Sequence, residues 1–576
     1  MHKTLRLAFR CAIVVLTSAF VSTWCGAQTW LPSPHFGNVE QHQRLYDLAR
    51  VWADAHFDPA VNLIAFENKD NPAVLEHYLR ESGYYAYGLL LTGKPEDRAR
   101  AQAILRQVFT KQDLRKDQPT YGSFPNAFET DWAHWTKPDL NWAEFMGAFM
   151  AHIVWLDDQR HVLDPDVRSQ LDQSFQLTVE NAMHRDVDPH YTNIALLTAA
   201  VVSAGAKLEN MPGTAEFAQK KLQAVYNMAS QGTFTEYLSP TYYGADFYSL
   251  YSAQRFACSD AFADLANRTL DLLWHDTAAA YHAPTYQLGG PAARSYGDNM
   301  LEYVPVIKYF IYLGTNGKYP ITDDEVKLPH AFDICMFMLI SDLPVEARPE
   351  FTQPPVPWRE VLVYDNGAGF QRYIRQFRDG DFILGTVSEK DEWVQCRNVV
   401  AYWPRPDGDH LGLCQDVTGR TAPDSNHTCD FYSTQNGPVV LAGMIERLAD
   451  PTAPRASRLM FNDRAKVTAM EEGQLHYVID SAPVEAVLFP ITHGDGHLTV
   501  QNIDGGTCLD RSFSTGDPVS KETILGYILA FRLPGQKEPE IKDLSLQTGE
   551  DKATLKATAN GTLISLDIPY KPSPLH

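Results

Sequence analysis

Hydrophobic positions in the first half of the chain recur every three to four residues, which places them on one face of a helix. This spacing predicts helices over residues 41–56, 73–91, 95–109, 141–156, 164–183, 191–203, 214–230, 247–266 and 303–313. Asp164 followed by Pro165 is typical of a helix start, and Gly205 of a helix stop. So many consecutive helices, without a short repeat of fixed signature, favour an α/α toroid over a solenoid.

After residue 357 the hydrophobic period becomes two, which is typical of strands. It predicts strands over residues 361–364, 370–376, 381–387, 398–403, 438–445, 474–479, 487–490, 498–503, 527–532, 553–557 and 563–568. Turn formers such as Asp379-Gly380 and Asn560-Gly561 separate them. Many short strands in succession favour an antiparallel β-sandwich.

The expected fold class is therefore multidomain α+β, with an N-terminal α/α toroid (an incomplete barrel) followed by an antiparallel β-sandwich. We expect the toroid at residues 28–340 and the sandwich at 358–576. The Pro-rich stretch 341–357 between them is expected to be a linker.

The N-terminus has the pattern of a signal peptide. Basic residues precede an apolar run at 11–21, and Cys25-Gly26-Ala27 offers small residues for cleavage after residue 27. No later run of about 20 apolar residues could span a membrane. The mature protein is expected to be secreted or periplasmic.

Charge and cysteine content narrow the function. The formal net charge of −22 over 576 residues argues against a nucleic-acid partner, whose phosphates need a basic face. No C-x-x-C pair is present, and no cofactor or metal site is predicted. An oxidising compartment permits disulfides, and Cys396, Cys414 and Cys429 lie close enough in sequence for one bridge among them, although the sequence does not give the pairing.

The stretch 232–248, reading G-T-F-T-E-Y-L-S-P-T-Y-Y-G-A-D-F-Y, carries candidate chemistry. Its tyrosines and its turn formers suit a cleft wall that grips a ring-shaped ligand, although tyrosines that plug a gap between two helices would give the same composition. Tyr242 or Tyr243 could act as a general base, with carboxylates from Glu236 and Asp246 nearby.

An earlier aromatic cluster suits carbohydrate. Indole faces stack on sugar rings, and amides or acids bind hydroxyl groups. The alternative is a Trp-rich helix entry packed in the core. The cluster consists of Trp132, Trp135, Asp139, Asn141 and Trp142.

Other candidates are single polar residues at element boundaries. His190 and Asn193 open an apolar helix, where Asn193 could cap the helix or donate to a carboxylate. Arg294 follows a Gly-rich loop and precedes Tyr296; it could bind a carboxylate or form a surface ion pair. Arg397 lies in a polar and aromatic stretch of the second domain that could face the cleft.

The run G-T-F-T-E-Y-L-S-P-T-Y-Y-G, with T-N before it and G-P-x-x-R-x-Y after it, resembles polysaccharide lyases of the toroid-plus-sandwich type. These are the heparinase II/III-like enzymes and the alginate or chondroitin lyases. The resemblance implies β-elimination on an acidic polysaccharide or oligosaccharide that contains uronic acid. It assigns carboxylate neutralisation to Asn193, base or acid to Tyr242 or Tyr243, and carboxylate binding to Arg294.

The chain also departs from this family pattern. Ile194 follows the Asn where many relatives have His, and Tyr237 stands where others have His. With chondroitin-type spacing, Asp246 falls at the catalytic Tyr, and His190 could supply the missing imidazole. Two alternatives therefore stay open: an inverting glycoside hydrolase that uses Asp139 with Glu236, and a glycan-binding protein without catalysis.

Overall fold

The structure is a computed structural model, and the predicted signal peptide lies outside the residues it describes. It describes residues 39–67, 71, 73–135, 138–296, 300–301, 304–322, 331–364, 371–392, 395–407, 411–418, 429–446, 456–462, 465–470, 475–493, 496–503, 506–513 and 524–570. None of the helices within these ranges is both long and apolar enough to cross a bilayer.

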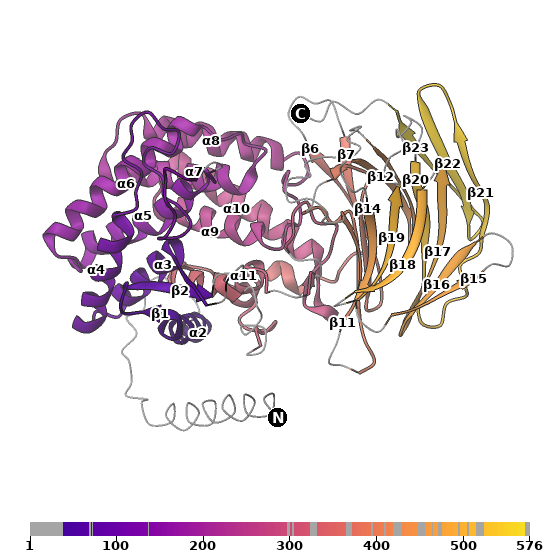
Figure 1. Ribbon diagram of the computed structural model, residues 1–576, viewed down its shortest axis with the longest axis horizontal. Helices are drawn as coiled ribbons and strands as arrows, with labels where there is room; N and C mark the ends of the chain where they lie inside the picture. The colour runs from indigo at the N-terminus through magenta and orange to yellow at the C-terminus, as the bar shows by residue number, and fades with distance from the viewer. Residues whose placement is uncertain are drawn as a thin grey trace.

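The first part of the chain consists of packed helices that lie beside the sheets of the second part (Figure 1). The helices are α2 (Val39–His56), α3 (Leu79–Leu91), α4 (Pro95–Phe109), α5 (Trp142–Arg160), α6 (Pro165–Arg185), α7 (Thr192–Glu209), α8 (Thr214–Ala229), α9 (Tyr242–Arg255), α10 (Asp260–Ala280), α11 (Ile307–Gly314) and α12 (Phe337–Ile340), with 3₁₀ turns at Ala283–Thr285, Ala331–Met336 and Pro349–Thr352. Helices α3, α5, α7 and α9 are buried along most of their length, whereas α4, α6, α8 and α10 bury one side. The former make an inner layer and the latter an outer one, which confirms the predicted α/α toroid.

The second part consists of antiparallel sheets. One sheet has the order β18 (Gly496–Ile503), β19 (Gly506–Phe513), β14 (Ala456–Asn462), β11 (Leu411–Thr418), β10 (Val399–Pro404), β8 (Phe382–Val387), β7 (Gln371–Asp379), β6 (Trp358–Tyr364). The next has the order β15 (Lys466–Met470), β16 (His476–Ser481), β17 (Val484–His493), β20 (Ile524–Arg532), β13 (Val439–Glu446), β12 (Cys429–Asn436), β9 (Glu389–Glu392). The last is β21 (Ile541–Thr548), β22 (Lys552–Ala559) and β23 (Thr562–Pro569). The predicted β-sandwich is confirmed.

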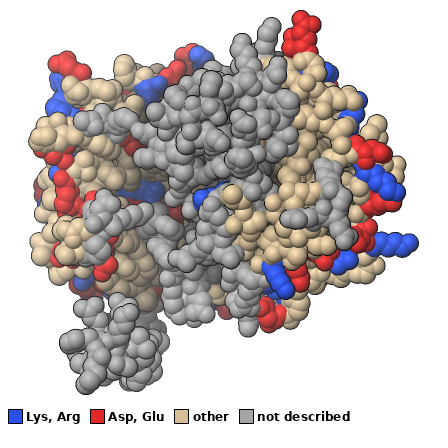
Figure 2. Space-filling model, turned by 45° about the vertical axis from the view of Figure 1, so that its right-hand side comes forward, with Lys and Arg blue, Asp and Glu red and all other residues tan. Residues whose placement is uncertain are grey.

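The sheets stack in layers beside the toroid (Figure 1). The sheet with β6, β7 and β14 lies nearest the helices, the sheet with β17 and β20 follows, and β21–β23 lie outermost. Ile528 of β20 and Ile568 of β23 share the outer apolar core. Toward the edges of the face that Figure 2 shows, acidic and basic side chains lie next to one another, so charges of both signs mix there.

Two predicted helices are wrong in their limits. The first turn of the predicted helix 73–91 is instead β3 (Leu75–Tyr78), which pairs with β2 (Leu63–Glu67). Strand β2 also pairs with β1 (Phe57–Asp58), and the hydrophobic pattern did not predict this small sheet. The predicted helix 247–266 is split between α9 and α10, because the Ser259 hydroxyl accepts a hydrogen bond from the Phe262 amide and starts a new helix.

Gly205 does not end its helix, contrary to the prediction. Helix α7 continues to Glu209 and stops at Asn210, which has a left-handed backbone conformation. Gly205 instead allows close packing, since a Cβ atom there would lie 2.9 Å from Val179 Cγ1. In the sequence, a glycine that lets two helices pack closely therefore looks the same as a glycine that ends a helix.

The disulfide that the sequence permits is not formed. Cys396 and Cys414 are buried and neither forms a disulfide, so no bridge joins any two of the three cysteines. Cys414 on β11 stands opposite Ala401 of β10, whereas Cys396 lies before that strand begins. The two residues are thus separated along the strand direction, and closeness in sequence does not bring the thiols together.

The toroid and the first sheet pack closely where the Gly-rich loop meets β8. A Cβ atom on Gly385 would lie 1.8 Å from the Gly290 carbonyl oxygen. The Gln376 amide of β7 donates to the carbonyl oxygens of Gly289 (3.0 Å) and Gly290 (2.8 Å). Ala292 also pairs with Arg397 through backbone hydrogen bonds. These contacts fix the loop that carries Arg294 against the sandwich.

Candidate active site

Glu236 is the centre of the candidate site. It lies in the segment between α8 and α9 and is 6% exposed. Its Oε2 accepts hydrogen bonds from the Asn193 backbone amide (2.8 Å) and from Asn193 Nδ2 (2.6 Å), both at the start of α7. Its Oε1 accepts one from Arg294 Nη1 at 2.7 Å. An internal carboxylate therefore occupies Asn193 and Arg294, the two groups predicted from the sequence to bind a substrate carboxylate.

Arg294 connects this carboxylate to two phenols. Arg294 Nη2 donates to the Tyr242 hydroxyl at 2.8 Å, and its guanidinium carbon lies 3.8 Å from the centre of the Tyr242 ring. The Tyr242 and Tyr296 hydroxyl groups share a short hydrogen bond. Tyr242 is 8% exposed and Tyr296 is 40% exposed, so the chain of contacts leads from a buried carboxylate to the surface.

The protonation of Tyr242 is set by two opposing effects. Burial raises the pKa of Tyr242 well above its ordinary value of 10.0, while the neighbouring Arg294 acts to lower it. The net direction is upward, so Tyr242 is a neutral phenol at neutral pH. As a neutral phenol, Tyr242 can donate a proton. It can act as a base only after the Tyr242–Tyr296 pair has lost one of its two hydroxyl protons.

Tyr243 faces the other way. It is fully buried, and its hydroxyl donates to Asp276 Oδ2 of α10 at 2.6 Å. Thr233 lies 3.3 Å from the same hydroxyl. Because successive helical residues point about 100° apart, only Tyr242 of the two candidates contacts Arg294. Tyr237 is also fully buried, and its backbone oxygen accepts from the Ala293 amide at 3.0 Å.

Asp246 lies one turn after Tyr242 and is fully buried. Within the described ranges, neither of its carboxyl oxygens has a hydrogen-bond partner, and the same is true of Asn193 Oδ1. Burial raises the pKa of Asp246 well above its ordinary value, and the nearby Glu236 raises it further. Burial and Glu236 therefore both favour the protonated, neutral form of Asp246 beneath the site.

His190 belongs to the rim of the site. Its Nδ1 lies 2.6 Å from Asp188 Oδ1, and its backbone oxygen accepts from the Thr235 hydroxyl at 2.7 Å. The second contact ties the start of α7 to the segment that holds Glu236. His190 is thus near the cluster, but the hydrogen bonds given above connect Glu236 to Asn193 and Arg294 instead.

The aromatic cluster divides into two groups. Asn141 belongs with the site: its Nδ2 donates to the Tyr191 hydroxyl at 3.1 Å, and the Arg294 guanidinium lies 5.2 Å from the Tyr191 ring centre. Trp142 lies under the Arg80 guanidinium, 5.7 Å from ring centre to carbon. Arg185 Nη2 donates a hydrogen bond to Asn141 Oδ1 at 2.6 Å, which fixes the orientation of the Asn141 amide.

Trp132 and Trp135 form a separate pair, with ring centres 5.6 Å apart. Trp132 Nε1 donates to the Lys111 carbonyl oxygen at 3.0 Å. Asp139 is exposed and accepts from the Asn141 backbone amide at 2.9 Å. Both oxygens of Glu236 accept hydrogen bonds from N–H donors. This geometry does not support the alternative of an inverting glycoside hydrolase, in which Asp139 and Glu236 would act as acid and base on either side of a water molecule.

The sandwich contributes Gln395, a residue that was not predicted from the sequence. Gln395 Oε1 accepts from Arg294 Nε at 2.8 Å. Arg397, which was predicted to bind substrate, is almost fully buried and donates to the Cys396 carbonyl oxygen at 2.7 Å. The polar stretch was placed correctly at the toroid, but the residue that reaches Arg294 is Gln395. Within the described residues, no group of three or more His, Cys, Asp and Glu side chains could hold a metal ion.

A family model described as a domain of unknown function, DUF8769, matches residues 43–343, which is more than half of the chain. The chain belongs to the DUF8769 family. The matched region contains the whole toroid side of the site, from Asn193 to Arg294, whereas Gln395 lies beyond it. No curated protein matches the DUF8769 chain in sequence.

Several solved structures are similar to this DUF8769 protein over most of their length. Heparinase III matches at 11% identity with a TM-score of 0.46, covering 94% of this chain and 92% of the other. Heparan sulfate lyase HepC from Pedobacter heparinus matches at 10% identity and 0.34, covering 92% and 95%. A chondroitin AC lyase mutant from Streptomyces coelicolor A3 matches at 11% and 0.38, covering 90% and 89%. At these identities, the similarity concerns the fold alone.

Proposed function

We propose that this DUF8769 protein is a polysaccharide lyase that cleaves a uronic-acid-containing glycan by β-elimination. The observation that supports it most is the arrangement of Arg294, which already binds one carboxylate through Nη1 and a phenol through Nη2. A uronate presents the same chemical group, and the proton to be removed lies on the carbon next to it. Arg294 thus places guanidinium N–H donors beside two groups that can move protons.

In this mechanism Arg294 stabilises the enolate-like intermediate, because positive charge near the carboxylate makes the adjacent C–H more acidic. The uronate binds Arg294 on the side of Tyr242, where Tyr296 is exposed. Asn193 is completely buried and acts as a positioning residue: it holds Glu236, which in turn holds Arg294.

Tyr242 and Tyr296 exchange protons with the substrate. The pair first releases one proton to solvent; the resulting phenolate takes the proton from C5, the C4–O bond breaks as the C4=C5 bond forms, and the other phenol protonates the leaving oxygen. The pair then holds one proton as before, in the opposite place. Transfer across the hydrogen bond between the two hydroxyl groups restores the starting state.

The test is the ultraviolet absorbance of the conjugated double bond that elimination creates. The protein without residues 1–27 is incubated with alginate, glucuronan, glycosaminoglycans and a neutral glucan. We expect absorbance to rise with one or more acidic glycans and not with the neutral one, and to be lost in Tyr242→Phe and Arg294→Gln. New reducing ends without absorbance, dependent on Asp139 or Glu236, would instead establish a hydrolase.

A further inference from the structure

A cavity of about 490 Å³ lies where the end of the toroid meets the sandwich. It is lined by the end of α10, by residues 318–319 after α11, by residues 350–356 and by β7. None of the residues that contact Arg294 or Glu236 lines it. Its volume is in the range of sites that hold small ligands.

Arg378 brings a buried positive charge to this cavity. Its side chain is 8% exposed, and Nη2 donates to the Ala279 carbonyl oxygen near the end of α10 at 2.5 Å. Within the part of the chain that the structure describes, no Asp or Glu forms an ion pair with Arg378. Burial and the neighbouring Arg359 lower the pKa of Arg378 to about 10, so it stays charged at neutral pH.

Besides Arg378, the cavity is lined by a second basic side chain, by a carboxylate and by an imidazole. Lys318 is exposed at the cavity and has no carboxylate partner among the described residues. Glu350 accepts from Arg348 through Oε1 at 3.1 Å, while its buried Oε2 has no partner within the same ranges. His282 is bonded through Nδ1 to Thr285, and its Nε2 is likewise without a partner there.

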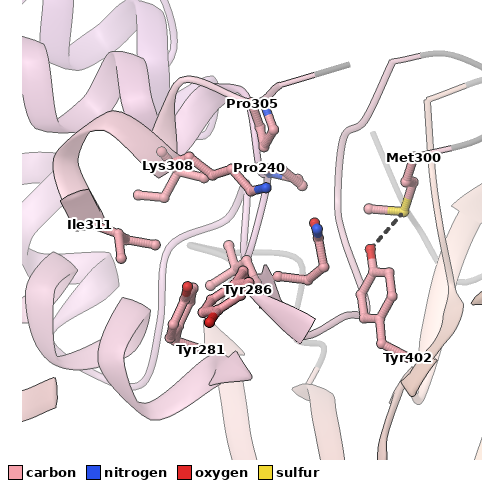
Figure 3. A pocket seen from close by; sticks show the side chains of 11 residues that line it. Pro240, Tyr281, Tyr286, Met300, Pro305, Lys308, Ile311 and Tyr402 are labelled. Atoms are coloured by element: carbon pink, nitrogen blue, oxygen red, sulfur yellow. Dashed lines mark hydrogen bonds between the residues drawn. The ribbon is translucent and has the colours of Figure 1, made fainter. Parts of the chain in front are cut away.

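Aromatic rings form the rest of the wall. The Tyr319 ring centre lies 4.8 Å from Tyr281 and 6.4 Å from Phe351, and Lys318 Nζ lies 5.0 Å from the Tyr319 centre. Tyr281 also lines a neighbouring pocket of about 10 Å³ together with Tyr286 (Figure 3). That pocket has room for about one water molecule, so the larger cavity is the one that can take a ligand.

We propose that this cavity is a second binding site, separate from the candidate active site, and that it binds an acidic saccharide. Arg378 and Lys318 supply charge for a carboxylate, and the rings supply flat surface for a sugar ring. The free oxygen of Glu350 would repel a simple anion but can accept a hydrogen bond from a sugar hydroxyl. The combination of basic side chains, aromatic rings and a carboxylate acceptor therefore favours a carboxylated sugar over phosphate or sulfate.

The test measures binding and not turnover, so its outcome does not depend on the proposed elimination. Calorimetric titration of the full-length mature protein uses glucuronate, with glucose and inorganic phosphate as controls. The variants are Arg378→Gln, Lys318→Gln and, for the candidate active site, Arg294→Gln. We expect a glucuronate-binding component that Arg294→Gln retains and that Arg378→Gln weakens about tenfold or more.

Lys318→Gln keeps the test valid if Arg378→Gln disturbs the end of α10, because Lys318 is exposed and lies outside that contact. It should weaken the same component severalfold without changing the melting temperature. Two results would overturn the proposal: glucuronate binding that neither cavity variant alters, or binding of glucose or phosphate at least as tight as that of glucuronate.

Discussion

At the scale of single residues, Tyr242 and Tyr243 show how neighbours in sequence acquire different roles. Tyr242 contacts Arg294 and Tyr296, whereas Tyr243 is bonded to Asp276 inside the toroid. The sequence offered both as the base, because a phenol pattern does not reveal which way each ring points. The direction follows from the helical phase of α9, which begins at Tyr242.

The matched substitutions Tyr242→Phe and Tyr243→Phe test this assignment. Tyr242→Phe should lower the elimination rate by about 10²- to 10⁴-fold, as expected for a lost acid–base group. Tyr243→Phe should keep the rate but lower the free energy of unfolding by about 1–3 kcal/mol, since a buried carboxylate loses a donor. Steady-state rates and denaturant unfolding measure the two effects. Equal loss of rate in both variants would contradict the assignment.

Asp246 predicts a pH dependence of stability. Burial and Glu236 raise its pKa in the folded protein, so the folded state holds a proton that the unfolded state has released. Its contribution is complete below the ordinary Asp pKa and is lost as pH rises toward the folded pKa, by at most about 1.4 kcal/mol per pH unit.

Asp246→Asn cannot ionise and should remove this component. The melting temperature of Asp246→Asn relative to the unaltered protein should therefore increase between pH 4 and pH 7. Thermal unfolding at matched ionic strength measures the difference. A difference that is constant across this range would show that Asp246 is ionised when folded.

At the scale of elements, the inner helices depend on small residues at their crossings. A Cβ atom on Gly147 of α5 would lie 2.7 Å from Val201 Cγ1 of α7 and 2.9 Å from Thr178 Cγ2 of α6. Gly147→Ala should lower the free energy of unfolding by roughly 1–3 kcal/mol despite the better helix propensity of Ala. Gln170→Ala on the exposed side of α6 is the control and should change it little. Stabilisation by Gly147→Ala would contradict this packing.

The same elements show what a sequence predicts well. Residues 95–109 were predicted as a helix with the limits that α4 has, since its amphipathic period and its first-turn proline agree. The small sheet β1–β3 was missed because its strands are short and have no alternating pattern. Asp379-Gly380 was predicted correctly as a turn between strands β7 and β8, because Gly380 adopts a positive φ of 55°.

At the scale of the whole molecule, the candidate site is completed by both domains. The sequence alone indicated Glu236, Arg294 and Tyr242 through their clustering in two motifs. It did not indicate Gln395, which lies 101 positions from Arg294 and reaches it only because the first sheet packs on the Gly-rich loop. Long-range contacts of this kind follow from domain packing and not from local pattern.

Gln395 predicts that activity depends on this packing. Gln395→Ala removes the acceptor for Arg294 Nε and should lower the elimination rate by roughly 10- to 100-fold through misplacement of the guanidinium. Gln395→Glu keeps an acceptor at the same place and should retain most of the rate. The comparison of kcat for these two variants makes the measurement. A rate that both variants preserve would mean that Arg294 is positioned without the sandwich.

The mass of the oligosaccharide products tests the central claim most directly. Elimination breaks the chain without adding water, so its unsaturated products are one water molecule lighter than the products of hydrolysis. We predict that the protein releases the lighter products from a uronic-acid-containing glycan and that Tyr242→Phe releases none. Release of only the heavier, saturated products would contradict the assignment of this protein as a lyase.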